Sequence, residues 1–127
     1  MFKELDIAGK KIRVYPAKKP YAPAVYLNAI ESDCSDVRRR CFDEGCPDFT
    51  FVSVSGLRWN DELTPWPHDC ITRSDAPYAG EAQGYLCDLT EKIMPVVEQE
   101  IGGRPLYSAL AGYSLGGLFA LWASFQN

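Results

Sequence analysis

The chain has 127 residues, of which 46% are hydrophobic and 24% charged, and this is typical of one globular domain with a modest core. Its net charge of −4 and its scattered lysines and arginines argue against nucleic acid or an anionic membrane as a partner. The sequence contains no run long enough to span a membrane and no secretory signal. We therefore expect a soluble, cytoplasmic protein with a single domain over residues 1–127.

The chain has an odd number of cysteines and one histidine. Without a secretory signal, the cysteines are expected to be reduced thiols. His68 and Cys70 lie close together, but no C-x-x-C pair or regular ligand spacing accompanies them. The sequence therefore predicts no metal site and no cofactor. Cys34, Val37 and Cys41 share one helical face, where thiols are expected to pack inward as small hydrophobic groups.

Four strands are predicted in the first half of the chain. Residues 5–14 alternate between apolar and polar side chains around the turn Ala8-Gly9-Lys10, which indicates an antiparallel hairpin along the edge of a larger sheet. Residues 24–27 form a short apolar run that is typical of a covered parallel strand. Residues 49–54 predict the next strand.

Helices are expected between and after these strands. Residues 35–44 predict a helix that Ser35 or Asp36 can cap. Residues 85–101 carry apolar side chains at helical spacing. Pro95 falls inside this second segment and should bend it or break it in two, because proline lacks the amide hydrogen that a helix interior needs.

The last elements are a strand over residues 105–111 and a helix over residues 115–125 that is apolar nearly all round. Strands and helices therefore alternate, which predicts an α/β fold with a parallel sheet. The segment over residues 55–80 is a long loop rich in Trp, Pro, Asp and Gly. We expect it to lie over the carboxyl ends of the strands, where open α/β sheets bind ligands.

One motif indicates catalytic chemistry. Gly112-Tyr113-Ser114-Leu115-Gly116 has the pattern G-x-S-x-G between a predicted strand and a predicted helix. Such a turn is so sharp that larger side chains at the glycine positions would collide. It is expected to give Ser114 a positive φ and an outward-facing Oγ, and to leave the amide of Leu115 free to donate to an oxyanion.

The segment Ala109–Leu121 around this motif resembles the nucleophile elbow of the enterochelin-esterase-like and esterase-D-like families of α/β-hydrolase-type serine esterases. The helix Tyr85–Pro95 resembles the family helix that ends in an apolar-Pro step before the nucleophile strand. Leu63-Thr64-Pro65-Trp66-Pro67 resembles the "PWP" loop of a bacterial branch. The resemblance spans most of the chain, from the N-terminal hairpin onward.

The resemblance implies a carboxylic-ester hydrolase with Ser114 as the nucleophile and a small-molecule ester as the substrate. It also implies a second oxyanion donor after the strand at residues 24–27, where the family commonly has a His-Gly or Ser-Gly sequence. Here the chain reads Asn28-Ala29-Ile30, so the donor is Ala29 or, as we favour, Ile30. The substrate pocket is expected to be lined by the aromatic side chains Trp59, Trp66 and Tyr113. Packing of the tryptophans over the rim of the sheet is an equal alternative.

The catalytic triad of the fold runs in the order Ser, Asp or Glu, His, but none of these acidic residues or histidine follows Ser114. His68 precedes the motif and fits a pocket rim better than a base. We therefore expect a partial α/β-hydrolase fold, with an N-terminal antiparallel hairpin followed by parallel strands and crossover helices, truncated after the elbow helix. The chain alone is expected to be inactive or weakly active.

Two further expectations concern assembly. A non-catalytic α/β-hydrolase fragment that serves as an assembly or interaction module is the alternative function. In either case the strand over residues 105–111 lacks a neighbour on one side, and the helix over residues 115–125 carries more apolar side chains than the remaining elements can bury. We expect a homodimer through that strand or that helix.

Overall fold

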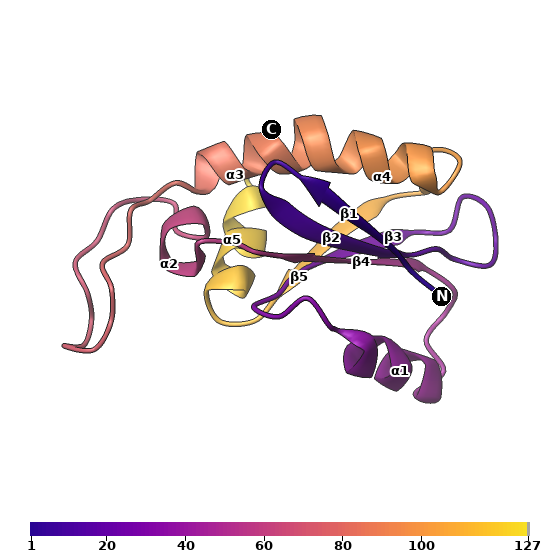
Figure 1. The fold of residues 1–127 in the computed structure, drawn as a ribbon, viewed down its shortest axis with the longest axis horizontal. Coiled ribbons are helices and arrows are strands. Elements are labelled where there is room, and N and C mark those ends of the chain that lie inside the picture. The colour runs from indigo at the N-terminus through magenta and orange to yellow at the C-terminus, as the bar shows by residue number, and fades with distance from the viewer. Residues whose placement is uncertain (127) are drawn as a thin grey trace.

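The computed structural model describes residues 1–126, whose strands form one mixed sheet with helices against both faces (Figure 1). Strands β1 (Lys3–Ile7) and β2 (Lys10–Tyr15) pair antiparallel. Ala8 and Gly9 turn the chain between them with φ angles of 54° and 77°, which match the twist of a tight hairpin. Because the strand order is β1-β2-β4-β3-β5, the predicted hairpin at the edge of the sheet is confirmed.

The other three strands form the parallel part of the sheet. Strand β4 (Thr50–Ser55) lies between β2 and the parallel strand β3 (Ala24–Asn28), and all of its residues are buried. Strand β5 (Ser108–Gly112) pairs parallel with the other side of β3. The predicted parallel α/β sheet is therefore confirmed.

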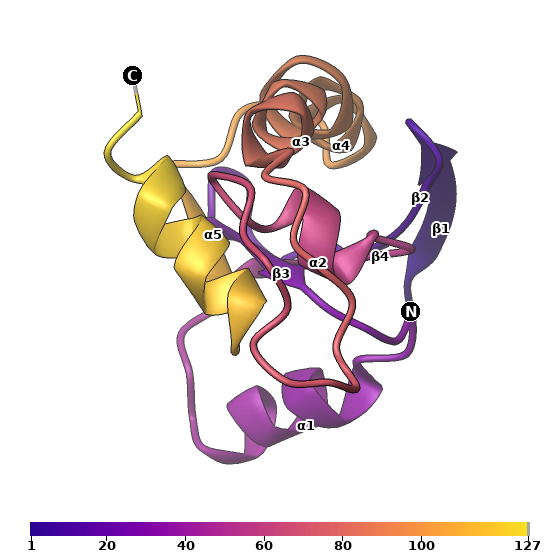
Figure 2. The ribbon, with the colours of Figure 1, turned by 90° about the vertical axis from the view of Figure 1, so that its left-hand side faces the viewer.

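The helices cover the two faces of the sheet unequally. The helical segment of α3 (Ala82–Asp88) and α4 (Met94–Glu100) lies beside α5 (Leu115–Ala123) on one face, while α1 (Ser35–Asp43) lies on the opposite face (Figure 2). The main core lies under α3, α4 and α5. Its largest fully buried side chains include Tyr26, Val52, Val54, Tyr85, Leu89, Ile93 and Phe119.

Pro95 does not break the helical segment in two, which was one of the two outcomes expected from the sequence. A π-helical turn, η1 (Leu89–Ile93), joins α3 to α4, and Pro95 follows it in the first turn of α4. The wider π-helical turn changes the hydrogen-bonding pattern just before the residue that cannot donate. The segment therefore continues as one rod across the sheet (Figure 1).

The last strand and the last helix are shorter than predicted. The amide of Leu106 donates to the carbonyl of Tyr21 outside the ladder, and Pro105 has no amide hydrogen, so β5 begins only at Ser108. After Ala123 the backbone switches to tighter bonds three residues apart, which end α5 before Phe125.

The prediction for α1 is wrong in two details. Neither Ser35 nor Asp36 caps it, because Cys34 occupies the cap position and the side chain of Asp33 accepts the amide N–H of Ser35 at 3.0 Å. The predicted inward face is present only at Cys34, since α1 itself contains no buried residue and Val37 is 45% exposed. Only Cys34 is buried, in a small cluster with three other residues, and so small an apolar surface cannot cover a helical face.

The long loop contains a short helix, α2 (Trp59–Glu62), that the sequence did not predict. The five cysteines are free: Cys34, Cys41, Cys46, Cys70 and Cys87. Within residues 1–126, no helix combines the length and the apolar character needed to cross a membrane.

Candidate active site

Ser114 lies at the corner between β5 and α5. It is exposed and has φ of 53° and ψ of −125°, a conformation that residues with a side chain rarely adopt. Glycine is needed at position 112 because a Cβ there would overlap the backbone of Gly116. A Cβ on Gly116 would itself lie 3.4 Å from Asn28 and from the ring of Trp59. The predicted positive φ of Ser114 at the corner between strand and helix is confirmed, as is the need for glycine at position 112.

Among the backbone amides beside this corner that have no acceptor within residues 1–126, two match the predicted oxyanion donors. One belongs to Leu115, the first residue of α5. The other belongs to Ile30, two residues beyond the end of β3. The register pairs Asn28 with Gly112, so Ile30 and Ser114 each lie two residues past the same rung of the ladder. Both amides therefore emerge at the carboxyl edge of the sheet.

The amide of Ala29 is not available in the same way. It donates to the carbonyl of Val54 at 2.8 Å and so extends the ladder between β3 and β4 by one residue. The sequence left two candidates for the second oxyanion donor, Ala29 and Ile30. Of these two amides, only that of Ile30 is unbonded.

A hollow of about 180 Å³, which we call the Trp66 hollow, opens next to the elbow. Trp66 and His68 from the long loop line it together with Leu115 and Leu118 from α5. The other predicted pocket residues do not line it. Trp59 and Tyr113 pack on each other instead, with ring centroids 5.6 Å apart, so Trp59 contacts the residue that precedes Ser114.

His68 lies on the rim of the Trp66 hollow. Its backbone exchanges two hydrogen bonds with Tyr78, at 3.0 and 2.9 Å. Its Nδ1 lies 2.6 Å from the carbonyl oxygen of Asp69. Since a carbonyl oxygen only accepts, Nδ1 carries the proton when the ring is neutral. No hydrogen bond joins His68 to Ser114 in the described chain.

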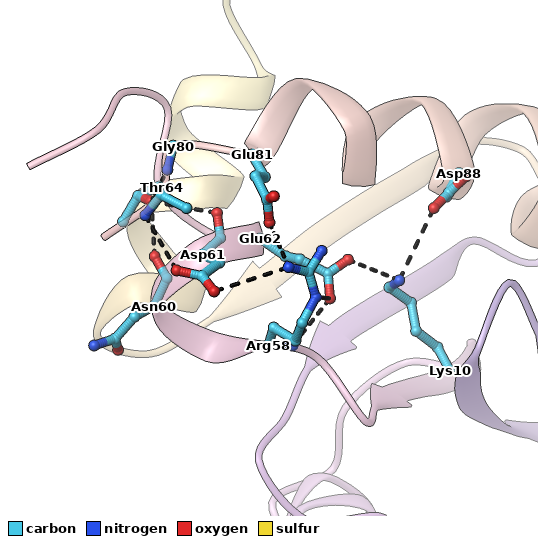
Figure 3. A network of polar contacts seen from close by, with 10 residues as sticks. Lys10, Arg58, Asn60, Asp61, Glu62, Thr64, Gly80, Glu81 and Asp88 are labelled. Atoms are coloured by element: carbon cyan, nitrogen blue, oxygen red, sulfur yellow. Dashed lines mark hydrogen bonds and ion pairs between the residues drawn. The ribbon is translucent and has the colours of Figure 1, made fainter. Parts of the chain in front are cut away.

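A buried ion pair anchors the long loop to the N-terminal hairpin (Figure 3). Lys10 Nζ lies 2.8 Å from a carboxylate oxygen of Glu62, and both side chains are less than a tenth exposed. Arg58 extends the network through its contacts with Glu62 and with Glu81, the latter at 2.7 Å. Sequence reasoning missed this network because Lys10 reads as an ordinary polar turn residue.

A second buried contact reaches the start of the Ala29–Ile30 segment. The hydroxyl of Tyr85 on α3 donates to the carboxamide oxygen of Asn28, the last residue of β3. Burial raises the pKa of Tyr85, so the phenol stays neutral and remains a donor. The carboxamide nitrogen of Asn28 has no partner in the described chain. The sequence signal for this contact was an asparagine that ends an apolar strand, which sequence reasoning did not connect to Tyr85.

A larger hollow lies away from the elbow, along the open edge of β5, and we call it the β5 groove. It measures about 680 Å³ and is lined by residues of β5, of α5 and of the helical segment from α3 to α4. Within residues 1–126, β5 pairs only with β3. The groove therefore follows a strand edge whose backbone groups have no partner strand.

Comparisons with known proteins agree with this architecture. The protein family described as "Putative esterase" matches residues 49–127. The siderophore hydrolase EstA from Aspergillus nidulans is 25% identical and superposes with a TM-score of 0.72 over 99% of this chain and 52% of its own. An IroE-like serine hydrolase from Shewanella oneidensis is 18% identical and has a TM-score of 0.72 over 97% of this chain and 45% of its own.

A sequence relative is the uncharacterized protein YbbA of Bacillus subtilis, which is 28% identical over 107 residues, or 80% of this chain and 43% of YbbA. The chain thus spans about half the length of the relatives it matches. The mixed sheet and the structural likenesses define a partial hydrolase fold of the α/β-hydrolase type. Since the family match covers more than half of the sequence, the chain belongs to the "Putative esterase" family.

Proposed function

We propose that this chain carries the nucleophile and the oxyanion hole of a serine esterase that acts on small-molecule esters. Ser114 Oγ attacks the carbonyl carbon of the ester. The amides of Leu115 and Ile30 donate to the oxygen that becomes negative. The observation that supports this most directly is the exposed Ser114 at positive φ, immediately before the N-terminus of α5.

The activity of the chain alone should be weak. A serine hydroxyl at its free pKa needs a base to become a good nucleophile. No Asp, Glu or His follows Ser114 in the sequence, and His68 makes no hydrogen bond to it in the described chain. An oxyanion hole without a base retains only a residual acceleration of about 10³–10⁴ over water.

Labelling with a fluorophosphonate probe tests the assignment. We expect slow, stoichiometric modification of Ser114, detected by intact mass and by peptide mapping. The Ser114→Ala variant should not be labelled. Modification of another residue, or equal labelling of the variant, would refute Ser114 as the nucleophile. Ester turnover at ordinary enzyme rates, lost in Ser114→Ala but also in His68→Ala, would instead assign the base to His68.

A second candidate function is an assembly or interaction module without catalysis. The β5 groove favours it, because an open strand edge and an apolar helix promote association. We propose a homodimer through β5 or α5. Phe125, which lies just beyond the end of α5 and is 78% exposed, would add apolar surface to such an interface. Light scattering at micromolar concentration should give twice the chain mass, and a monomer would refute this proposal.

We also propose that the protein works in the cytoplasm. Its five cysteines are free, and cytosolic conditions keep thiols reduced. Fractionation of cells that produce the protein should recover it with cytosolic markers, and recovery in a secreted or periplasmic fraction would contradict the proposal.

A further inference from the structure

We propose that the Trp66 hollow binds a compact, uncharged apolar group of the substrate, of about the size of a phenyl ring. The inference rests on the proposed function, since it assigns this group to the ester that Ser114 attacks. The Trp66 hollow, formed by the long loop and α5, would thus act as a specificity site that favours esters with such a group.

The chemistry of the lining supports an apolar ligand. Trp66, Ile71 and Leu118 are large hydrophobic side chains that remain 61%, 74% and 37% exposed. All three border the same hollow, so water covers apolar surface on several of its sides. A bound apolar group would release that water, and apolar burial is favourable by about 25 cal/mol per Å².

The size of the hollow limits the group. A dry protein cavity of about 150 Å³ is known to hold benzene, and the Trp66 hollow measures about 180 Å³. A phenyl or branched alkyl group fits this volume, whereas a fused aromatic system or a long acyl chain would extend beyond it.

The polar groups of the lining select against charge. No Asp, Glu, Lys or Arg lines the hollow. The backbones of His68 and Tyr78 are bonded to each other and are therefore not free to bind a ligand. A charged substituent would lose water without meeting a carboxylate, ammonium or guanidinium group, which is unfavourable.

The position of the hollow connects it to the reaction. Leu115 lines the hollow and carries the unbonded amide that we propose as an oxyanion donor. A group held against Leu115 thus lies one residue from the serine. Trp59 and Tyr113 do not line this hollow.

The rates at which two sulfonyl fluorides modify Ser114 test the inference. Phenylmethanesulfonyl fluoride carries a benzyl group and methanesulfonyl fluoride only a methyl group. In both reactions the bond between Oγ and sulfur forms, the sulfur–fluorine bond breaks, and fluoride and the hydroxyl proton leave to solvent. Intact mass against time gives the rate for each reagent.

The variants separate the hollow from the nucleophile. Trp66→Ala and Leu118→Ala should slow the benzyl reagent about tenfold, a typical effect of losing an apolar contact in a pocket. They should change the methyl reagent by less than about twofold. The matched control is Leu121→Ala, an exposed leucine on the same helix that does not line the hollow, and it should change neither rate. Equal slowing of both reagents, or no effect in Trp66→Ala, would overturn the inference.

A binding measurement keeps this test distinct from the proposed function. If neither reagent modifies Ser114 in the unaltered chain, the proposed function fails. Benzyl alcohol titrated into ¹⁵N-labelled protein should still shift the indole N–H signal of Trp66 and leave that of Trp122 unchanged. Absence of the Trp66 shift would overturn the binding site itself.

Discussion

The ion pair between Lys10 and Glu62 gives the sharpest prediction about stability. Both charges are buried, so removing one partner leaves the other without compensation in a poorly solvated site. Removing both, in the double variant with Lys10→Met and Glu62→Leu, leaves apolar side chains of similar size. We therefore expect the double variant to be more stable than at least one of the single variants.

The two single variants should differ, because their stranded partners have different neighbours. Without Lys10, Glu62 still accepts the backbone N–H of Arg58 at 2.9 Å and faces its guanidinium at 3.5 Å. Without Glu62, Lys10 keeps a long 3.4 Å bond to the Ala8 carbonyl, Asp88 at 3.9 Å, and a cation–π contact with the ring of Tyr85 at 5.4 Å, all of them weaker than the lost pair. Breaking a buried pair costs about 3–5 kcal/mol. We expect Glu62→Leu near the upper end of that range and Lys10→Met near or below the lower end.

Urea unfolding at pH 7, followed by circular dichroism, measures the free energy of unfolding of all four proteins in this double-mutant cycle. A coupling energy of about 2 kcal/mol or more is expected, since the second substitution removes the charge that the first one stranded. If the two single effects simply add, or if Lys10→Met is the more damaging substitution, the reasoning from burial and neighbours is wrong.

Three further predictions use the same unfolding assay. Gly112→Ala should prevent native folding, because the new Cβ would overlap the backbone of Gly116. The control Gly84→Ala on α3 meets no atom within 4 Å and should raise the free energy of unfolding by up to about 1 kcal/mol. Equal effects of the two substitutions would refute the elbow argument. Asp48 accepts two amide N–H bonds that lower its pKa, so its contribution to stability should be complete above the ordinary aspartate pKa of about 3.9 and disappear as the pH falls through the lower folded value. The Asp48→Asn variant should lack this acid dependence, and an unchanged acid profile would contradict the assignment. Tyr85→Phe leaves the carboxamide of Asn28 without its donor and should lower the free energy of unfolding by about 1–3 kcal/mol at pH 8. Because burial raises the pKa of Tyr85, the native protein should lose stability above about pH 10, and the Tyr85→Phe variant should lose less. Identical alkaline profiles of the two proteins would contradict this second effect.

Local patterns in the sequence predicted the elements that local rules govern. The alternation around Ala8-Gly9 fixes a hairpin because the period and the turn residues agree. The glycines around Ser114 predicted the elbow because no larger side chain fits at position 112. In both places, the prediction needed only a constraint that a few adjacent residues carry.

Contacts between distant segments could not be predicted in this way. Lys10 and Glu62 are far apart in sequence, and neither residue type is typical of a core. The prediction of an inward face on α1 was wrong for a related reason. Helical spacing at Cys34, Val37 and Cys41 does not reveal how little apolar surface lies beneath the helix. The sequence already favoured Ile30 over Ala29 as the second oxyanion donor, but it could not show that the amide of Ala29 is bonded to Val54 in the paired sheet.

The strained serine corner has a consequence for the order of folding. Asn28 and Trp59, which approach Gly116 most closely, both precede Ser114 in the chain and leave the ribosome first. The strand β5 then adds to β3, a strand synthesised long before it. The residues that surround the corner are therefore synthesised before the corner itself. The proposed reactivity of Ser114 would thus be a chemical marker that the sheet has assembled, because an unassembled chain has no packed sheet to hold its serine at positive φ.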